Sequence, residues 1–182
     1  MVSLINPWGW TIATKPLTHI NKSIIIQAPH TSNWDAVLGL IAAKKTGLSI
    51  KFIIKDTWNR PFIGPLLRSL GAIFVDRRQP NGLTQQLIDH LNAIKTGHII
   101  FTPEGTRAKV KKWKTGFYYI AQQAGIPIAL GYIDYKTKTI GIHSCNYPKG
   151  NIQTDMPPIR TFYQTITPKH PDQYDPDWTV PS

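Results

Sequence analysis

A histidine and an aspartate stand five residues apart, at His30 and Asp35, in the polar segment that follows an apolar run. An imidazole that donates one N–H to a carboxylate keeps its other nitrogen free to accept a proton. Such a pair can activate a hydroxyl group for attack on an acyl group, and general base catalysis of this kind contributes roughly 10²–10⁴ in rate. The spacing alone is a weak signal, because His170 and Asp175 repeat it near the C-terminus.

The elements around this pair favour a productive geometry. Residues 23–28 predict a buried strand, Pro29 ends it, and a helix is expected to begin near Ser32, three residues before Asp35 as in a capping box. Within one continuous helix, residues five apart would point about 140° away from each other. A histidine in the loop and an aspartate in the first helical turn can instead face each other. The alternative interpretation is a loop histidine that only helps to cap the helix.

A second polar run, Glu104-Gly105-Thr106-Arg107, follows the predicted strand 98–102. Loops at the carboxyl ends of strands are the usual ligand sites of open α/β sheets. The arginine fork suits a phosphate, the threonine adds a hydroxyl, and the glycine permits a tight turn. Glu104 is expected either to bind a substrate hydroxyl or to orient the arginine. The alternative is a plain turn with a surface Glu–Arg pair.

A third polar run, Asp76-Arg77-Arg78, ends the predicted strand 71–76. If this strand is parallel to its neighbours, both guanidinium groups reach the same edge of the sheet as Arg107. Convergence of Arg77 and Arg107 on one anion is the stronger hypothesis, and a pair of surface arginines is the alternative.

Short apolar runs alternate with helical patterns along the whole chain. This alternation predicts an α/β layered fold, with a mostly parallel sheet flanked by helices. A hairpin near the end of the chain makes the expected sheet mixed. The predicted strands are residues 23–28, 50–55, 71–76, 98–102, 126–135 and 139–144, and the predicted helices are residues 32–45, 83–95 and 117–123.

Length and composition indicate a single domain over residues 1–182, with a core at about 20–165 and an irregular proline-rich tail at 168–182. The one cysteine, Cys145, cannot form an internal disulfide, so a reducing cytoplasm is expected. No apolar run approaches the ~20 residues of a membrane span, and the N-terminus does not resemble a signal peptide.

The formal net charge of +11 predicts an anionic partner. Residues 107–114 hold five cations and Trp113, which predicts contact with an anionic membrane surface, helped by an apolar N-terminal foot. The expected foot consists of Leu4, Ile5, Trp8 and Trp10. The alternative is a solvated basic loop and an N-terminal segment packed on the core. A non-catalytic binder of nucleic acid or membrane is the rival class, in which His30 would be dispensable, but no nucleic-acid-binding motif supports it.

Taken together and in this order, the motifs resemble the glycerophosphate and lysophospholipid acyltransferase family, which includes bacterial 1-acyl-glycerol-3-phosphate acyltransferases. The matching elements are His30-x4-Asp35, Phe74-Val75-Asp76-Arg77, Pro103-Glu104-Gly105-Thr106-Arg107 and Ile126-Pro127-Ile128. The resemblance covers about residues 23–135.

This resemblance implies a glycerolipid acyltransferase fold. The implied reaction moves a fatty acyl group from acyl-CoA or acyl-carrier protein to the hydroxyl of a lysophospholipid such as 1-acyl-glycerol-3-phosphate, in phospholipid biosynthesis. His30 would be the general base and Asp35 would orient it. The positions matched to acceptor phosphate binding are Arg77, Glu104, Gly105, Thr106 and Arg107. No metal, bound cofactor or nucleic acid is expected, and the enzyme would sit peripherally on the cytoplasmic face of the inner membrane.

The sequence also departs from the family pattern. Pro29 stands where the family often has asparagine, Ala108 where serine commonly follows the Thr-Arg pair, and Leu130 near the place of a second proline. Membrane-associated N-terminal helices of some members are missing or much reduced. A non-phosphate lysolipid, such as an amino-acid lipid, is therefore the alternative acceptor. The acyl-chain length, the donor, the oligomeric state and the strand order stay open.

Overall fold

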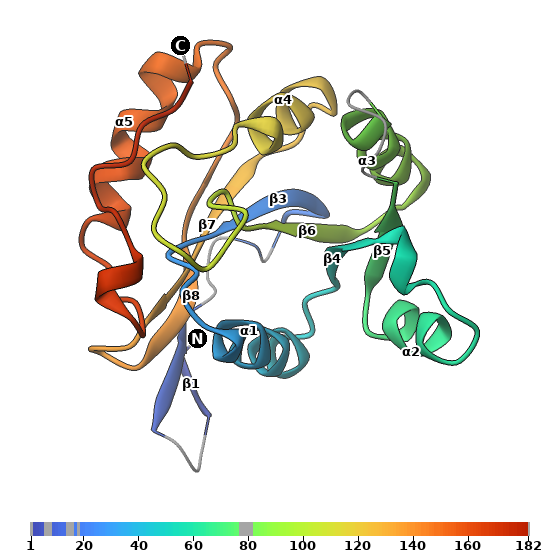
Figure 1. Cartoon of the computed structure of the whole chain (residues 1–182), viewed down its shortest axis with the longest axis horizontal. Helices are drawn as coiled ribbons and strands as arrows, with labels where there is room; N and C mark the ends of the chain where they lie inside the picture. The colour runs from blue at the N-terminus through green and yellow to red at the C-terminus, as the bar shows by residue number, and fades with distance from the viewer. Residues whose placement is uncertain (1, 6–8, 14–16, 18, 77–81, 182) are drawn as a thin grey trace.

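A computed structural model describes residues 2–5, 9–13, 17, 19–76 and 82–181. In this part of the chain, strands and helices largely alternate (Figure 1). The strands are β1 (Val2–Ile5), β2 (Trp10–Ala13), β3 (Lys22–Gln27), β4 (Ile50–Lys55), β5 (Ala72–Val75), β6 (Gly97–Phe101), β7 (Ile128–Asp134) and β8 (Thr139–Asn146). The helices are α1 (Asn33–Thr46), α2 (Ile63–Ser69), α3 (Gly82–Ala93), α4 (Gly116–Gln123) and α5 (Ile152–Tyr163), with short 3-10 turns η2 (Asp56–Trp58) and η3 (Pro171–Gln173).

The strands described form one sheet in the order β1-β2-β8-β7-β3-β6-β4-β5. The five strands from β7 to β5 are mutually parallel, so their carboxyl ends lie at one edge of the sheet. β8 runs antiparallel to β7, as the predicted hairpin requires. The sequence-based expectation of an α/β layered fold with a mostly parallel, mixed sheet is confirmed.

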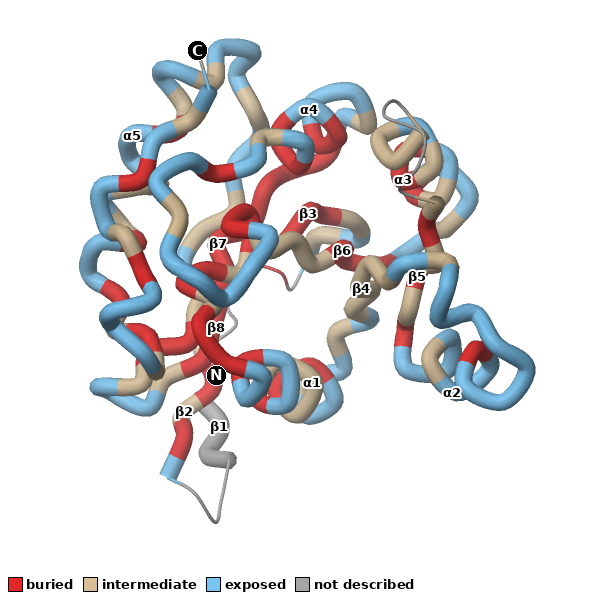
Figure 2. The backbone as a smooth tube through the Cα atoms, in the orientation of Figure 1, coloured by how far each residue is buried: buried red, intermediate tan, exposed pale blue. Residues whose placement is uncertain are grey.

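Helices cover both faces of this sheet (Figure 1). The helices α3, α4 and α5 pack on one face, where alternate isoleucines of β3 and β6 point into the larger core. Helix α1 packs on the other face, against β2, β7 and β8. The largest fully buried side chains include Trp113, Trp178, Tyr118, Tyr163 and Phe117. Figure 2 shows that the central strands are the most buried part of the chain.

Each predicted strand and helix is present within a few residues of its expected bounds. The sequence patterns missed β1, β2, α2 and α5. Helix α5 carries Pro157 and Pro158 in its interior, which hides the helical pattern, and its buried Met156 and Tyr163 hold it on the core. Strand β2 is too short to show a clear alternating pattern. It pairs with β1 just before it and with β8, which lies far along the chain.

The described α-helices have 7 to 14 residues. None of them combines the length and the apolar character that crossing a membrane requires.

Candidate functional site

His30 and Asp35 are in direct contact at the carboxyl edge of the sheet. The loop after β3 carries His30, and Asp35 lies in the first turn of α1, where the Ser32 side chain accepts a hydrogen bond from the Trp34 N–H and caps the helix. The His30 Nδ1 lies 3.0 Å from the Asp35 Oδ2. The capping box brings the carboxylate back toward the loop, so the predicted facing geometry is present.

Asp35 is buried and accepts several hydrogen bonds. The N–H groups of Thr31 and Ser32 donate to its Oδ2 at 3.0 Å, and the Tyr135 hydroxyl donates to its Oδ1 at 2.7 Å. Burial raises the pKa of Asp35, but the hydrogen bonds from His30, Tyr135 and the Ser32 N–H outweigh it, so the pKa lies below its usual value. The aspartate is therefore held as an anion that can fix the imidazole tautomer.

Tyr135 was missed by the sequence analysis. It directly follows β7, which is parallel to β3, so the topology places it at the same edge of the sheet as His30. In the sequence, the available signal for Tyr135 was its position directly after a buried strand. No local motif marks this residue. Burial, followed by the hydrogen bond to Asp35, raises the pKa of Tyr135, which stays a neutral donor.

Glu104 lies behind the histidine loop. Its Oε1 accepts a hydrogen bond from the His30 backbone N–H at 3.1 Å, while its buried Oε2 has no hydrogen-bond partner among the described residues. Burial raises the pKa of Glu104 to about 7, although N–H donors from its own backbone and from His30 lower it. Glu104 therefore ties the loop after β6 to the loop after β3.

His30 and Asp35 open onto a cleft of about 570 Å³. Most of its lining is apolar and comes from α1, β4 and β6. The apolar and glycine lining residues are Ala36, Gly39, Leu40, Ile50, Phe52, Ile53, Leu83, Ile100, Phe101 and Gly105. A cleft of this volume and polarity can hold an alkyl chain with its polar end at the histidine.

Among the described residues that line this cleft, Lys114 is the one lysine or arginine. Its backbone N–H donates to the Pro103 carbonyl at 2.9 Å, and its side chain extends over Gly105. Gly105 has a φ of 67°, a backbone conformation that favours glycine, and a Cβ there would come within 2.7 Å of the flexible Lys114 Nζ, which would have to move aside. In the sequence, Lys114 stands out only as one of the five cations of residues 107–114.

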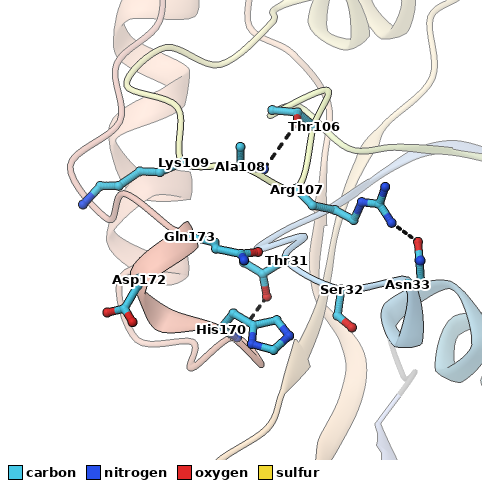
Figure 3. Close-up of a pocket in the computed structure, with 10 residues that line it drawn as sticks. All are labelled: Thr31, Ser32, Asn33, Thr106, Arg107, Ala108, Lys109, His170, Asp172 and Gln173. Carbon is cyan, nitrogen blue, oxygen red and sulfur yellow. Dashed lines mark hydrogen bonds between the residues drawn. The ribbon is translucent and has the colours of Figure 1, made fainter.

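Thr106 and Arg107 line a second, more polar hollow of about 580 Å³ beside the first (Figure 3). The Arg107 guanidinium donates to the Asn33 side-chain oxygen at the start of α1. The structure thus brings Glu104 and Gly105 next to His30, while Thr106 and Arg107 face the neighbouring hollow. A substrate that contacts both His30 and Arg107 must extend across both hollows.

The proline-rich tail also reaches this second hollow. The His170 N–H donates to the Thr31 hydroxyl at 3.2 Å. With its amide nitrogen facing them, Gln173 donates to the carbonyl oxygens of Arg107 and Thr31, each at 3.0 Å. Gln173 therefore joins the two site loops, a role that no sequence pattern indicated. His170 and Asp175, which repeat the five-residue spacing, are not linked by a hydrogen bond or ion pair in the structure described.

Some other expectations concern residues outside the described part of the chain, and others are corrected by the structure. Arg77, with Arg78, and Trp8 lie outside the described residues, as do the side chains of Leu4 and Ile5. Trp113 is buried and stacks on Trp178, with ring centroids 3.6 Å apart, so the prediction that it meets a membrane is wrong. Trp10 is likewise buried, against Tyr135.

Metal-ligating side chains are also scattered. Among residues 2–5, 9–13, 17, 19–76 and 82–181, no three His, Cys, Asp or Glu side chains are placed to hold one ion.

The layered α/β fold, with a histidine–aspartate pair beside a cleft at one sheet edge, has the features of an enzyme that uses a histidine as its base. A family model described as Acyltransferase matches residues 12–130. The chain therefore belongs to the Acyltransferase family, which confirms the resemblance seen in the motifs, and the protein is a transferase of acyl groups. Comparison with curated proteins gives no significant match.

Proposed function

We propose that this acyltransferase moves a fatty acyl group from a thioester to the hydroxyl of a lysophospholipid such as 1-acyl-glycerol-3-phosphate, as a step of phospholipid biosynthesis. The observation that carries the proposal is the His30 ring, fixed by Asp35 at 3.0 Å and opening onto an apolar cleft of about 570 Å³. A base at the polar end of an alkyl-sized cleft suits attack on a long-chain acyl group.

The proposed reaction is a direct transfer. The Nδ1–H of His30 donates to Asp35, which leaves Nε2 to take the proton from the acceptor hydroxyl. The oxygen attacks the thioester carbonyl, a C–O bond forms, the C–S bond breaks, and the thiolate leaves with the proton from the imidazolium. Asp35 is charged throughout and stabilises the imidazolium that forms between the two proton transfers.

The second hollow is proposed to receive the acceptor head group. Arg107 and Thr106 supply a guanidinium and a hydroxyl for a phosphate, with Arg77 as a further proposed contact. Gly105 lets the substrate approach the backbone, and Glu104 holds the His30 loop in place. Because such a lipid resides in a bilayer, we also propose peripheral association with an anionic membrane surface.

The test is acyl transfer from a palmitoyl thioester of CoA or of acyl-carrier protein to a panel of lysolipids with and without a phosphate. We expect His30→Ala to lower kcat by about 10²–10⁴ with the fold retained by circular dichroism. His143→Ala is the matched control, because that exposed ring stacks on Phe162 away from the cleft. Unchanged turnover in His30→Ala would remove this residue from the mechanism.

The acceptor is tested in the same panel. Arg107→Ala is expected to raise KM for phosphorylated acceptors and to leave KM for uncharged ones unchanged. If the wild-type enzyme prefers a non-phosphate lysolipid, the proposed phosphorylated acceptor is wrong. The proposed acyl-transfer reaction would not be affected by this result.

A further inference from the structure

A cluster of apolar side chains is exposed on the segment η2–α2, outside both hollows. It consists of Trp58, Phe62, Ile63, Leu66 and Leu70, here called the α2 patch. Phe62 is 94% exposed and Leu66 is 60% exposed. Scattered apolar residues are common on protein surfaces, but five within thirteen positions mark an interaction surface.

The patch follows from the way α2 sits on the sheet. Ile63, Leu66 and Leu70 have the i, i+3, i+7 spacing of one helix face, and all three are exposed. In Figure 2 most of α2 has the pale blue of exposed residues. The inner side of α2 is occupied by the buried Gly64, where a Cβ would come within 2.7 Å of the Asn59 side chain. Gly64 is thus the buried residue of α2 and Leu67 is half-buried, whereas Ile63, Leu66 and Leu70 are exposed.

Cations surround the patch. Lys55, Arg60 and Arg68 are exposed on the same segment, and residues 51–70 contain four cations and one carboxylate. Arg68 is held in place, since its guanidinium lies 5.1 Å from the Phe74 ring centroid and donates to the Asn59 side-chain oxygen at 2.8 Å. Apolar residues with fixed cations beside them are complementary to an anionic lipid surface.

The patch is also placed where a lipid substrate would enter. Strand β4 contributes Ile50, Phe52 and Ile53 to the cleft and continues directly into η2 at the sheet edge that carries His30. Figure 1 shows α1 and α2 on the same face of the sheet, on either side of β4. A bilayer that contacts α2 therefore lies along the face on which the apolar cleft is built.

We propose that the α2 patch docks the protein on an anionic bilayer, with Phe62 and Leu66 entering the boundary between head groups and acyl chains. The proposal rests on the proposed function for its choice of a lipid surface. A second copy of the chain fits the patch less well, because an isologous contact would bring the Arg60 and Arg68 groups of the two copies together.

Vesicle flotation tests the proposal on the full chain without any substrate. We expect the wild-type protein to float with vesicles of 30% phosphatidylglycerol in phosphatidylcholine, and the double variant Phe62→Gln/Leu66→Gln to bind at least about tenfold more weakly. Tyr147→Gln is the matched control, because Tyr147 is an exposed aromatic residue outside the patch. Equal binding by the double variant and the wild type would overturn the proposal.

The cations are tested with a second matched pair. Arg60→Gln is expected to weaken binding to the anionic vesicles several-fold and to make it less sensitive to salt. Lys95→Gln makes the same charge change just before β6, at the opposite edge of the sheet, and is expected to have a smaller effect. Equal losses in the two variants would show that net charge, rather than this surface, attracts the membrane.

Two further measurements separate the outcomes. Sedimentation without lipid reports self-association, and a wild-type dimer that the double variant dissociates would assign the patch to a second copy and overturn docking. Turnover of a short-chain acceptor below its critical micelle concentration is expected to be unchanged in the double variant. Absence of turnover in the wild type with intact vesicle binding would instead refute the proposed function alone.

Discussion

The carboxylates of Asp35 and Glu104 lie close to His30 but respond oppositely to their surroundings. Both side chains are buried, yet Asp35 accepts hydrogen bonds at both oxygens, while the Oε2 of Glu104 has no partner among the residues described. The pKa of Asp35 is therefore lowered and the pKa of Glu104 is raised to about 7. The number of donors, rather than burial alone, decides which carboxylate is charged at neutral pH.

This difference predicts how stability depends on pH through Glu104. Its pKa rises from an ordinary value of about 4.5 in the unfolded chain to about 7 in the fold, so the folded state binds an extra proton between these pH values. The free energy of unfolding therefore falls as pH rises from about 4.5 to about 7. We expect Glu104→Gln, which keeps an acceptor for the His30 N–H, to be more stable relative to wild type at pH 8 than at pH 5, by up to about 3 kcal/mol.

Urea unfolding at pH 5 and pH 8 measures this difference. Asp89→Asn is the control, because Asp89 is exposed on α3 and its removal leaves the buried site unchanged. A difference between wild type and Glu104→Gln that is the same at both pH values would show that Glu104 is already charged in the folded protein at pH 5.

At the scale of elements, helix α1 contributes both to the histidine–aspartate pair and to the proposed acyl site. Its first turn fixes Asp35, and its next turns present Ala36, Gly39 and Leu40 to the cleft. A Cβ added at Gly39 meets no atom within 4 Å, so the cleft has free space at this glycine. The absence of a side chain at Gly39 thus enlarges the proposed acyl site.

Gly39→Leu is predicted to shorten the acyl chain that the enzyme accepts. We expect the ratio of kcat/KM for palmitoyl over octanoyl thioester to fall about tenfold, equivalent to about 1.4 kcal/mol. The fold should be kept, because leucine favours a helix over glycine by roughly 0.5–1 kcal/mol. Val37→Leu, on the exposed side of α1, is the control, and an equal shift in both variants would place the acyl chain elsewhere.

At the scale of the whole molecule, the C-terminal segment holds the loops after β3 and β6 in place. Trp178 stacks on Trp113 with an interplanar angle of 7°. Backbone hydrogen bonds of 2.9 Å join Thr179 to Lys111 and to Trp113. Together with the contacts of Gln173, they attach the basic run of residues 107–114 to the tail. The tail expected to be irregular is therefore part of the core that positions the second hollow.

Removal of the stack between Trp113 and Trp178 should lower the stability of the fold. Trp178→Ala is expected to lower the free energy of unfolding by about 3–5 kcal/mol, as for large buried aromatics in general. Trp58→Ala, on the α2 patch, is the matched control and should change stability by less than about 0.5 kcal/mol. Chemical denaturation of both variants gives the comparison, and a similar small cost in each would mean that the tail does not anchor the site.

The sequence by itself determined the local features of this protein. Short apolar runs placed the central strands and period-3.6 patterns placed three helices. The Ser32–Asp35 capping box fixed how Asp35 faces His30. All of these depend on residues only a few positions apart. The family motifs then indicated an acyltransferase.

Only the tertiary structure decided the rest, since it depends on contacts between distant parts of the chain. The Tyr135 hydroxyl reaches Asp35 because β7 and β3 are parallel, and Trp113 is buried because Trp178 returns to cover it. On α2, Gly64 is buried while Ile63, Leu66 and Leu70 are exposed, a difference that the pattern along the chain does not reveal. Hydrophobicity along the chain predicts which residues tend to be buried. The packing of the whole molecule decides which of them are buried.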